Sequence, residues 1–179
     1  MAVLLFFFFL SIAFSFLCSV LEAVLLSVTP RYIREQQSKG TVTGALLGKY
    51  KEDIDRPLSA ILTLNTIAHT VGAIGVGAKA GELFGTNFFS IFGFELSYES
   101  IIAVVMTLAI LLLSEIIPKT IGANNWRALS PFTVKTIRLL MWVLAPLVWL
   151  SQLITRSLKK EKERSILSRS DIMQITKEG

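Results

Sequence analysis

Three long apolar stretches, separated by charged segments, dominate the pattern of residues along the chain. The first covers residues 2–28, which contain no Lys or Arg and a single acid, Glu22. Two further stretches cover about 58–83 and 101–117. About 20 predominantly apolar residues are enough for a helix to cross the hydrocarbon core of a bilayer. The pattern therefore predicts an all-α membrane protein with three transmembrane helices in each subunit.

The charged segments predict how these helices are oriented. The connection 30–57 carries six basic residues against four acids, whereas the connection 84–99 carries two acids and no basic residue. Loops rich in Lys and Arg remain on the cytoplasmic side. The first stretch also lacks the basic start and the cleavage site of a signal peptide, so it is expected to stay in the mature protein. We expect a multi-pass protein of the cell inner membrane with its N-terminus outside and its C-terminus in the cytoplasm.

A fourth apolar region, at about 126–155, has a different character. Basic residues flank its apolar part on both sides, and Pro146 interrupts it. A proline inside a helix removes a hydrogen bond and produces a kink. Tryptophans, which prefer the membrane interface, stand at 126, 142 and 149. We therefore expect a Pro-kinked belt helix along the inner interface, with a fourth transmembrane helix as the alternative.

The remaining segments complete the predicted domain organisation. Residues 32–50 mix apolar and charged positions, which is typical of short juxtamembrane helices. A transmembrane domain is thus expected over 1–155. The charged residues 156–179, with Ser168 ahead of Asp171 as a helix start, are expected to form a cytoplasmic tail that leads to a soluble domain absent from this sequence.

Composition narrows the possible functions. The chain is 53% hydrophobic and 17% charged, and its net charge of +5 is explained by the basic flanks of the apolar stretches rather than by a nucleic-acid partner. The single cysteine, Cys18, can form no intramolecular disulfide and leaves the redox compartment undetermined. No phosphate-binding loop, zinc-protease motif or nucleophile elbow is present, so we do not expect an enzyme.

Strongly polar residues inside the predicted helices are few, and such residues tend to mark functional sites. Counted from the cytoplasmic ends, Ser19, Asn65 and Glu115 each lie about 10 to 14 Å into the membrane. A hydroxyl, an amide and a carboxylate can then meet at one level and bind a hard cation such as Mg²⁺, Ca²⁺ or Na⁺. Ser11 and Ser15 are expected to be structural, because serines in membrane helices usually bond to their own backbone or pack closely.

Two helix-breaking residues follow Glu115. Pro118 cannot donate a hydrogen bond to the carbonyl of Ser114, four residues earlier. Gly122 allows the backbone to leave the helix and to offer a second carbonyl. Broken helices whose free carbonyls bind ions recur in transporters. We therefore include Gly122 with the three side chains as a candidate metal ligand.

Other roles for the polar residues remain open on the sequence alone. Asn65 could simply join two helices by a hydrogen bond. Glu115 could pair with Lys119, one helical turn away. Glu22 could support the site or reach the cytoplasmic vestibule, and His69, one turn from Asn65, could relay protons or only pack.

Three segments together resemble the signature segments of the CorC/CNNM (cyclin M) magnesium transporter family. They are CSVLEAVLLS at 18–27, NTIAHT at 65–70 and SEIIPKTIG at 114–122. The resemblance implies a homodimer with three transmembrane helices and a kinked belt helix per subunit. It also implies Mg²⁺ export, with Na⁺ exchange as the driving force, and a cytoplasmic CBS-domain pair that binds ATP and Mg²⁺.

The resemblance carries over to the candidate site residue by residue. Ser19, Asn65 and Glu115 fall on the family's polar membrane positions, and Gly122 falls on the glycine of its motif. The family often has Asn where this chain has His69, which leaves the role of that residue open. We therefore expect a Mg²⁺ transporter with an oxygen-lined site that faces the cytoplasm. The alternatives are a membrane-anchored Mg²⁺ or nucleotide sensor and, less favoured, a channel.

Overall fold

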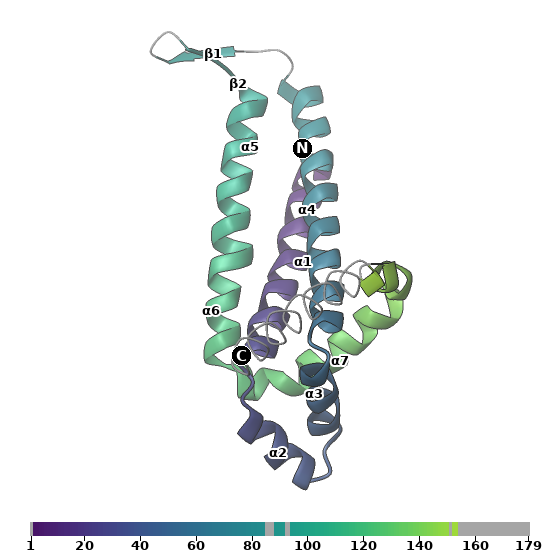
Figure 1. The fold of residues 1–179 in the computed structure, drawn as a ribbon. Coiled ribbons are helices and arrows are strands. Elements are labelled where there is room, and N and C mark those ends of the chain that lie inside the picture. Colours follow the sequence, from purple (N-terminus) through teal and green to yellow (C-terminus); the bar gives the residue numbers. More distant parts are fainter. Residues whose placement is uncertain (1, 85–87, 92–93, 151, 154–179) are drawn as a thin grey trace, which may run out of the picture.

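Three long helices form the body of the molecule. The computed structural model describes residues 2–84, 88–91, 94–150 and 152–153 of the 179-residue chain. Helix α1 (Ala2–Ser27) and helix α4 (Asp55–Phe84) run in opposite directions beside a third rod, which is made of α5 (Tyr98–Ala109), η1 (Ile110–Ile116) and α6 (Ile117–Asn124) (Figure 1). Each of the three is long and apolar enough to cross a membrane. The predicted all-α membrane fold is therefore confirmed.

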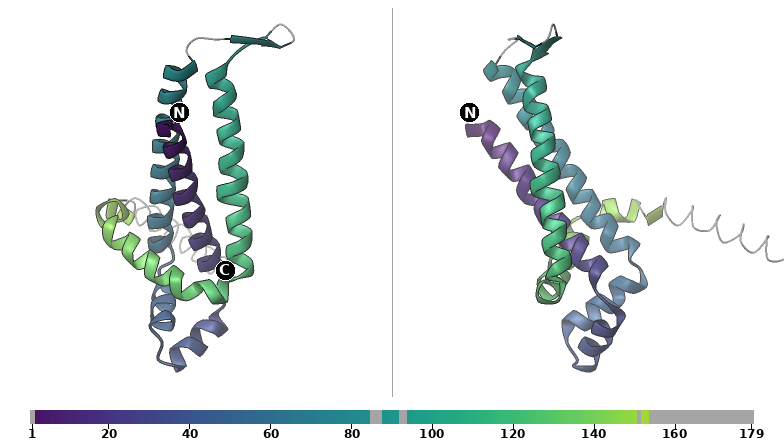
Figure 2. Two further views of the ribbon diagram at one scale, coloured as in Figure 1. Left: turned by 180° about the vertical axis from the view of Figure 1, so that it is seen from behind. Right: turned by 90° about the vertical axis from the view of Figure 1, so that its left-hand side faces the viewer.

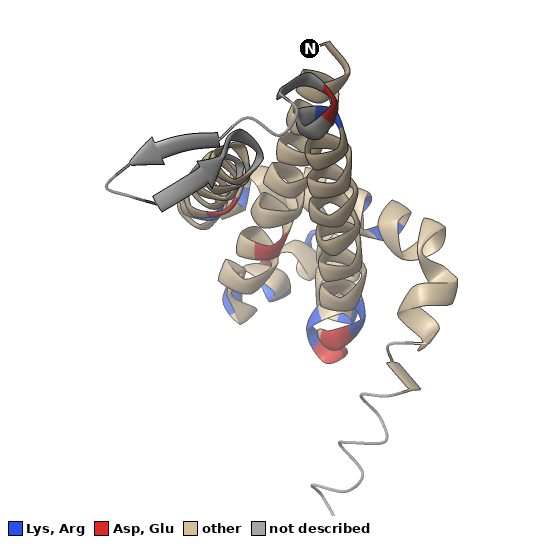
Figure 3. Cartoon of the chain, turned by 90° about the horizontal axis from the view of Figure 1, so that it is seen from above, with Lys and Arg blue, Asp and Glu red and all other residues tan. Residues whose placement is uncertain are grey.

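Helix α1 is the centre of the packing, because it contacts α4, η1, α6 and α7. Its lower half supplies Cys18, Leu21, Val24 and Leu25, all fully buried. The residues that cover them from other helices are Leu47, Ile61, Val134 and Ile137. Seen along the long helices, most of the ribbon carries no charged residue (Figure 3). The exposed side chains of these helices are largely apolar, as expected for surfaces that face lipid.

The two juxtamembrane helices begin at threonine caps. Thr29 Oγ1 accepts a hydrogen bond from the backbone of α2 (Pro30–Ser38), and Thr41 does the same for α3 (Val42–Glu52). Gly40 joins the helices with a φ of 66°, a conformation that costs glycine little. Gly44 brings α3 against α2, since a Cβ there would lie 2.5 Å from the backbone of Gln36. This close pair confirms the juxtamembrane helices expected from the sequence.

Helix α7 (Trp126–Val143) crosses the lower ends of the long helices (Figures 1 and 2). It turns Thr133, Val134 and Ile137 inward, whereas Leu139 and Trp142 are exposed. The helix breaks at Leu144 and resumes over 145–150. The belt and its kink near Pro146 are therefore confirmed. The expected tail over 156–179, with its helix start at Ser168 and Asp171, lies outside the described residues.

Hydrogen bonds attach the belt to the juxtamembrane helices. The Tyr50 hydroxyl donates to the Val134 carbonyl at 3.3 Å. The hydroxyls of Tyr32 and Ser130 lie 2.9 Å apart. These hydrogen bonds join α2 and α3 to α7 at the lower end of the bundle.

Two features differ from the sequence expectations. A two-stranded antiparallel hairpin, β1 (Phe88–Ile91) and β2 (Phe94–Ser97), connects α4 to α5, and no strand was expected there. The third rod also continues through Pro118 to Asn124 instead of ending at the proline. The physical reason is the wide π-helical turn η1, in which the Ile117 amide bonds to the Leu112 carbonyl five residues back. Pro118 then falls in the first turn of α6, where its missing N–H is tolerated.

Candidate metal centre

A chain of hydrogen bonds joins the three long helices at one level. Ser15 of α1 lies between the other two members. Its Oγ is 2.7 Å from Nε2 of His69 on α4 and 3.0 Å from Oγ of Ser114 on η1. Ser114 Oγ also donates to the Ile110 carbonyl of its own helix at 2.7 Å. Ser15 and Ser114 are fully buried. We call Ser15, His69 and Ser114 the hydroxyl–imidazole cluster.

Glu115 lies beside this cluster. Adjacent residues of a helix point about 100° apart, so Ser114 can face α1 while Glu115 faces α4. Glu115 Oε1 is 4.0 Å from His69 Nε2, and the two side chains are 32% and 30% exposed. The Glu115 carboxylate is thus directed toward α4 and remains partly exposed. The sequence alternative of a Glu115–Lys119 pair is not seen, because Lys119 Nζ lies 3.3 Å from Glu22 Oε2 instead.

Ser19 and Asn65 lie one helical turn away from the cluster, about 6 Å along the helix axes. Ser19 follows Ser15 by four residues on α1, and Asn65 precedes His69 by four on α4. Since the two helices are antiparallel, both residues are displaced toward the α2–α3 end. Ser19 is 2% exposed. The predicted oxygen donors therefore occupy two adjacent turns between the three helices.

The Asn65 side chain is unusual in its hydrogen bonding. Its Oδ1 is buried and has no hydrogen-bond partner among the described residues. A buried acceptor without a partner costs about 1–3 kcal/mol. Such an atom in a native protein needs a physical reason, and the binding of an ion or a water molecule is one of the few available. Asn65 Oδ1 is thus a candidate ligand on structural grounds as well.

Gly122 lies against α1. A Cβ at this position would be 2.9 Å from the Val20 carbonyl oxygen and 3.0 Å from the Ala23 Cβ, so only glycine permits the observed approach. Val20 is the neighbour of Ser19, which places Gly122 close to the level of Ser19. Gly122 also lies in the last turn of α6, where carbonyls lack intrahelical donors. Its carbonyl is therefore among those that can accept a partner from outside the helix, and the close packing of Gly122 is a role that sequence reasoning missed.

The donor set favours a hard cation. No group of three or more His, Cys, Asp or Glu side chains gathers within the described part of the chain. One carboxylate with hydroxyl, amide and carbonyl oxygens suits Mg²⁺, and imidazole nitrogen is a ligand that transition metals prefer.

Sequence reasoning treated Ser15 as structural and used only the carbonyl of Ser114. The spacing of four from Ser15 to Ser19 and from Asn65 to His69 was the available signal, because it puts each pair on one helix face.

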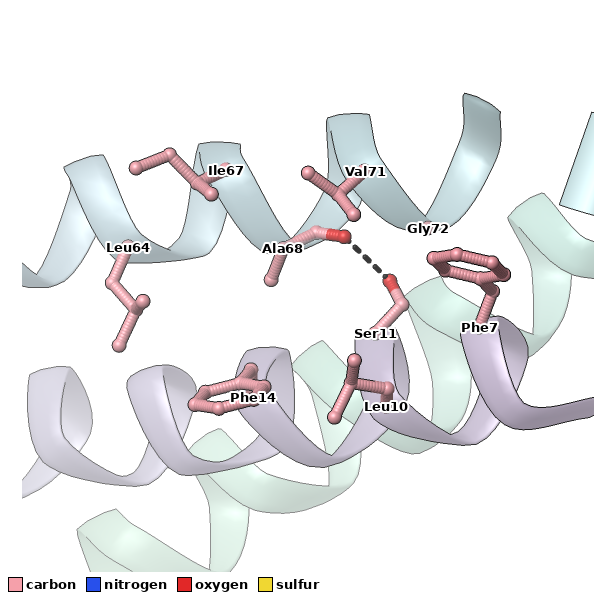
Figure 4. Close-up of a pocket in the computed structure, with 9 residues that line it drawn as sticks. All are labelled: Phe7, Leu10, Ser11, Phe14, Leu64, Ile67, Ala68, Val71 and Gly72. Carbon is pink, nitrogen blue, oxygen red and sulfur yellow. Dashed lines mark hydrogen bonds between the residues drawn. The ribbon is translucent and has the colours of Figure 1, made fainter. Parts of the chain in front are cut away.

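The side of the cluster toward the β hairpin is apolar. Between α1 and α4 lies a cavity of about 200 Å³ (Figure 4). The Ser11 hydroxyl donates to the Ala68 carbonyl at 3.0 Å and is thereby satisfied. The rest of the lining is apolar: Phe7, Leu10, Phe14, Leu64, Ile67, Ala68, Val71 and Gly72. The polar residues of the site thus continue toward the α2–α3 end and not toward the hairpin.

Comparison with known proteins agrees with this architecture. The profile of the cyclin M transmembrane N-terminal domain matches residues 5–179. The chain is 30% identical over 139 residues to the UPF0053 protein sll1254 of Synechocystis sp., covering 78% of this chain and 37% of that protein. It is 27% identical over 158 residues to a UPF0053 protein of Haemophilus influenzae, covering 83% and 34%. The chain spans about a third of the length of these relatives. The chain therefore belongs to the cyclin M family and carries its transmembrane domain.

Proposed function

We propose that the protein transports Mg²⁺ out of the cytoplasm in exchange for Na⁺. The observation that carries the proposal is the buried, unpartnered Asn65 Oδ1, one turn from the inward-directed carboxylate of Glu115. Membership of the cyclin M family supports a role related to Mg²⁺ transport. In this proposal Ser19, Asn65 and Glu115 bind the ion, and the Gly122 carbonyl completes the set.

The chemistry of these groups suits an ion that must be bound and released. Mg²⁺ requires near-octahedral oxygen at about 2.0–2.1 Å and dehydrates reluctantly, so several protein oxygens must replace its water. A single carboxylate keeps the binding weak enough for release. The Nε2 atom of His69 holds Ser15 and lies near Glu115, so we assign His69 to orienting these side chains.

The polarity of the site supports an opening toward the cytoplasm, from which an exported ion would be bound. The positive-inside rule puts the basic α2–α3 end in the cytoplasm and the hairpin outside. The polar residues continue toward the α2–α3 end. On the side toward the hairpin the residues are apolar and include Phe7 and Phe14. We therefore propose that this arrangement is an inward-facing state. We propose a homodimer in the bacterial inner membrane, with rearranged helices exposing the same site to the outside.

Replacing Asn65 with leucine tests the site. The substitution removes the unpartnered Oδ1, so without Mg²⁺ the variant should melt at the same or a higher temperature than the wild type. It should also lose the rise in melting temperature that Mg²⁺ produces by binding the folded state. The matched control is Thr66→Val, because Thr66 is exposed on the same helix and its hydroxyl donates to the Leu62 carbonyl. A Mg²⁺-dependent rise of unchanged size in Asn65→Leu would contradict the proposal.

Flux measurements in proteoliposomes separate transport from the alternatives. A Mg²⁺ flux that depends on Na⁺ and is lost in Asn65→Leu supports a transporter. Mg²⁺ binding without flux would favour the membrane-anchored sensor. A much faster flux that is independent of Na⁺ would favour a channel.

A further inference from the structure

A basic pocket lies where α3, α4 and α7 meet, outside the candidate metal centre. Its volume is about 350 Å³, which falls in the range of small-ligand sites, about 300–1,000 Å³. Its basic members come from three helices: Lys49 from α3, Arg56 from α4 and Arg138 from α7. The single acid in the lining is Asp53. The pocket thus has an excess of two positive charges.

The basic side chains of this pocket are available to a ligand. Neither the three Lys–Glu pairs nor the His69–Glu115 contact found among the described residues includes Lys49, Arg56 or Arg138. The buried Tyr50 in the wall gives its hydroxyl hydrogen to the Val134 carbonyl. Burial raises the pKa of Tyr50, so its phenol stays neutral and does not offset the positive charge. An anionic group is therefore the complementary occupant.

The position of the pocket identifies the source of the anion. Pro57 in its lining stands at the start of the membrane-spanning part of α4. On α7, Leu139 and Trp142 follow Arg138 and are 58% and 78% exposed. Exposed tryptophan beside leucine marks the level of the lipid headgroups. The pocket therefore opens at the membrane interface, not in bulk water.

The lining matches both parts of a phospholipid at the membrane interface, the charged headgroup and the apolar start of the acyl chains. The basic groups match the phosphate, and the apolar members Leu46, Pro57 and Met141 match the glycerol and the first methylenes of the acyl chains. Basic pockets on the cytoplasmic side of membrane helices bind anionic headgroups in this way. We propose that this pocket binds the phosphodiester headgroup of an anionic phospholipid and thereby fixes α7 to α3 and α4.

The test measures lipid retention by native mass spectrometry, with the protein released from nanodiscs that contain phosphatidylglycerol and phosphatidylcholine. Wild-type protein should retain phosphatidylglycerol selectively, and Arg138→Gln should retain it at least about tenfold less. Arg34→Gln is the matched control, because Arg34 is exposed on α2, outside this pocket, and its loss removes the same charge from the same end of the molecule. Lys49→Gln provides a second variant in case Arg138→Gln folds poorly.

The outcomes distinguish a lipid site from a free-phosphate site and from general attraction by surface charge. Equal loss in Arg34→Gln and Arg138→Gln would mean general attraction and would overturn the proposal. Release of retained phosphatidylglycerol by millimolar inorganic phosphate would indicate a free-phosphate site and would overturn the assignment to lipid. Unchanged retention of phosphatidylglycerol in both Arg138→Gln and Lys49→Gln would also overturn the proposal. The proposal is supported if the pocket variants lose phosphatidylglycerol, Arg34→Gln retains it, and millimolar inorganic phosphate does not release it from the wild type.

Discussion

Replacing Glu115 with glutamine is expected to lower the affinity for Mg²⁺ by at least about tenfold, which corresponds to about 1.4 kcal/mol. The substitution keeps the shape of the side chain and removes the one carboxylate among the proposed ligands. A hard divalent cation depends on that charge more than on any neutral oxygen. Because Glu115 is 32% exposed and its nearest ionisable neighbour, His69, is 4.0 Å away, the fold should tolerate the change. Calorimetry on purified protein measures the effect.

The matched control for Glu115→Gln is Glu82→Gln. Glu82 is 63% exposed near the other end of α4, where it pairs with Lys79. This control should keep wild-type Mg²⁺ affinity, whereas Glu115→Ala should lose binding and transport completely. Wild-type affinity in Glu115→Gln, or an equal loss in both glutamine variants, would remove the carboxylate from the proposed mechanism.

Replacing Gly122 with alanine should destabilise the protein by about 1–3 kcal/mol, the usual cost of overpacking. The added Cβ would lie 2.9 Å from the carbonyl oxygen of Val20, which is backbone and cannot rotate away. Helix α6 must therefore move away from α1, and the proposed Gly122 carbonyl would move with it. Both the melting temperature in detergent and the affinity for Mg²⁺ should fall.

Gly77→Ala is the control that separates this clash from a general effect of losing glycine. A Cβ at Gly77 has nothing within 4 Å. Alanine favours helix over glycine by about 0.8–1.0 kcal/mol, so this variant should be unchanged or more stable. Gly122→Ala is thus expected to lower the melting temperature, whereas Gly77→Ala should leave it unchanged or raise it. A decrease of the same size in both would show that the close approach at Gly122 is not the cause.

The helices that cross the membrane were predictable because their signal is local. The apolar stretches and the kink near Pro146 each depend on residues close together in sequence. The hairpin was missed because its eight paired residues lie in the connection 84–99. Only the charges of that connection were considered, and they predict the side of the membrane but not the secondary structure. The continuation through Pro118 was missed because a π turn depends on packing and leaves no distinct sequence pattern.

The contacts of the candidate site could not be predicted from the sequence. The offsets along each helix predicted one common level for Ser19, Asn65 and Glu115, whereas Glu115 lies beside His69, one turn from Asn65. Which side chains touch depends on the rotation of each helix about its axis, and the η1 turn changes that rotation for Ser114 and Glu115. The hydrogen bond between Ser15 and His69 and the approach of Gly122 to Val20 therefore became visible only in three dimensions.

The ion pair between Lys119 and Glu22 determines the electrical balance of the proposed ion site. Because each of these two residues neutralises the other, Glu115 is the acid near the site that has no Lys or Arg partner among the described residues of α1, η1 and α6. A sodium ion beside it forms an electroneutral complex, whereas a magnesium ion leaves one surplus positive charge in a medium of low permittivity. The transmembrane voltage would therefore exert a force on the magnesium-loaded site, which carries a net charge, and almost none on the sodium-loaded site.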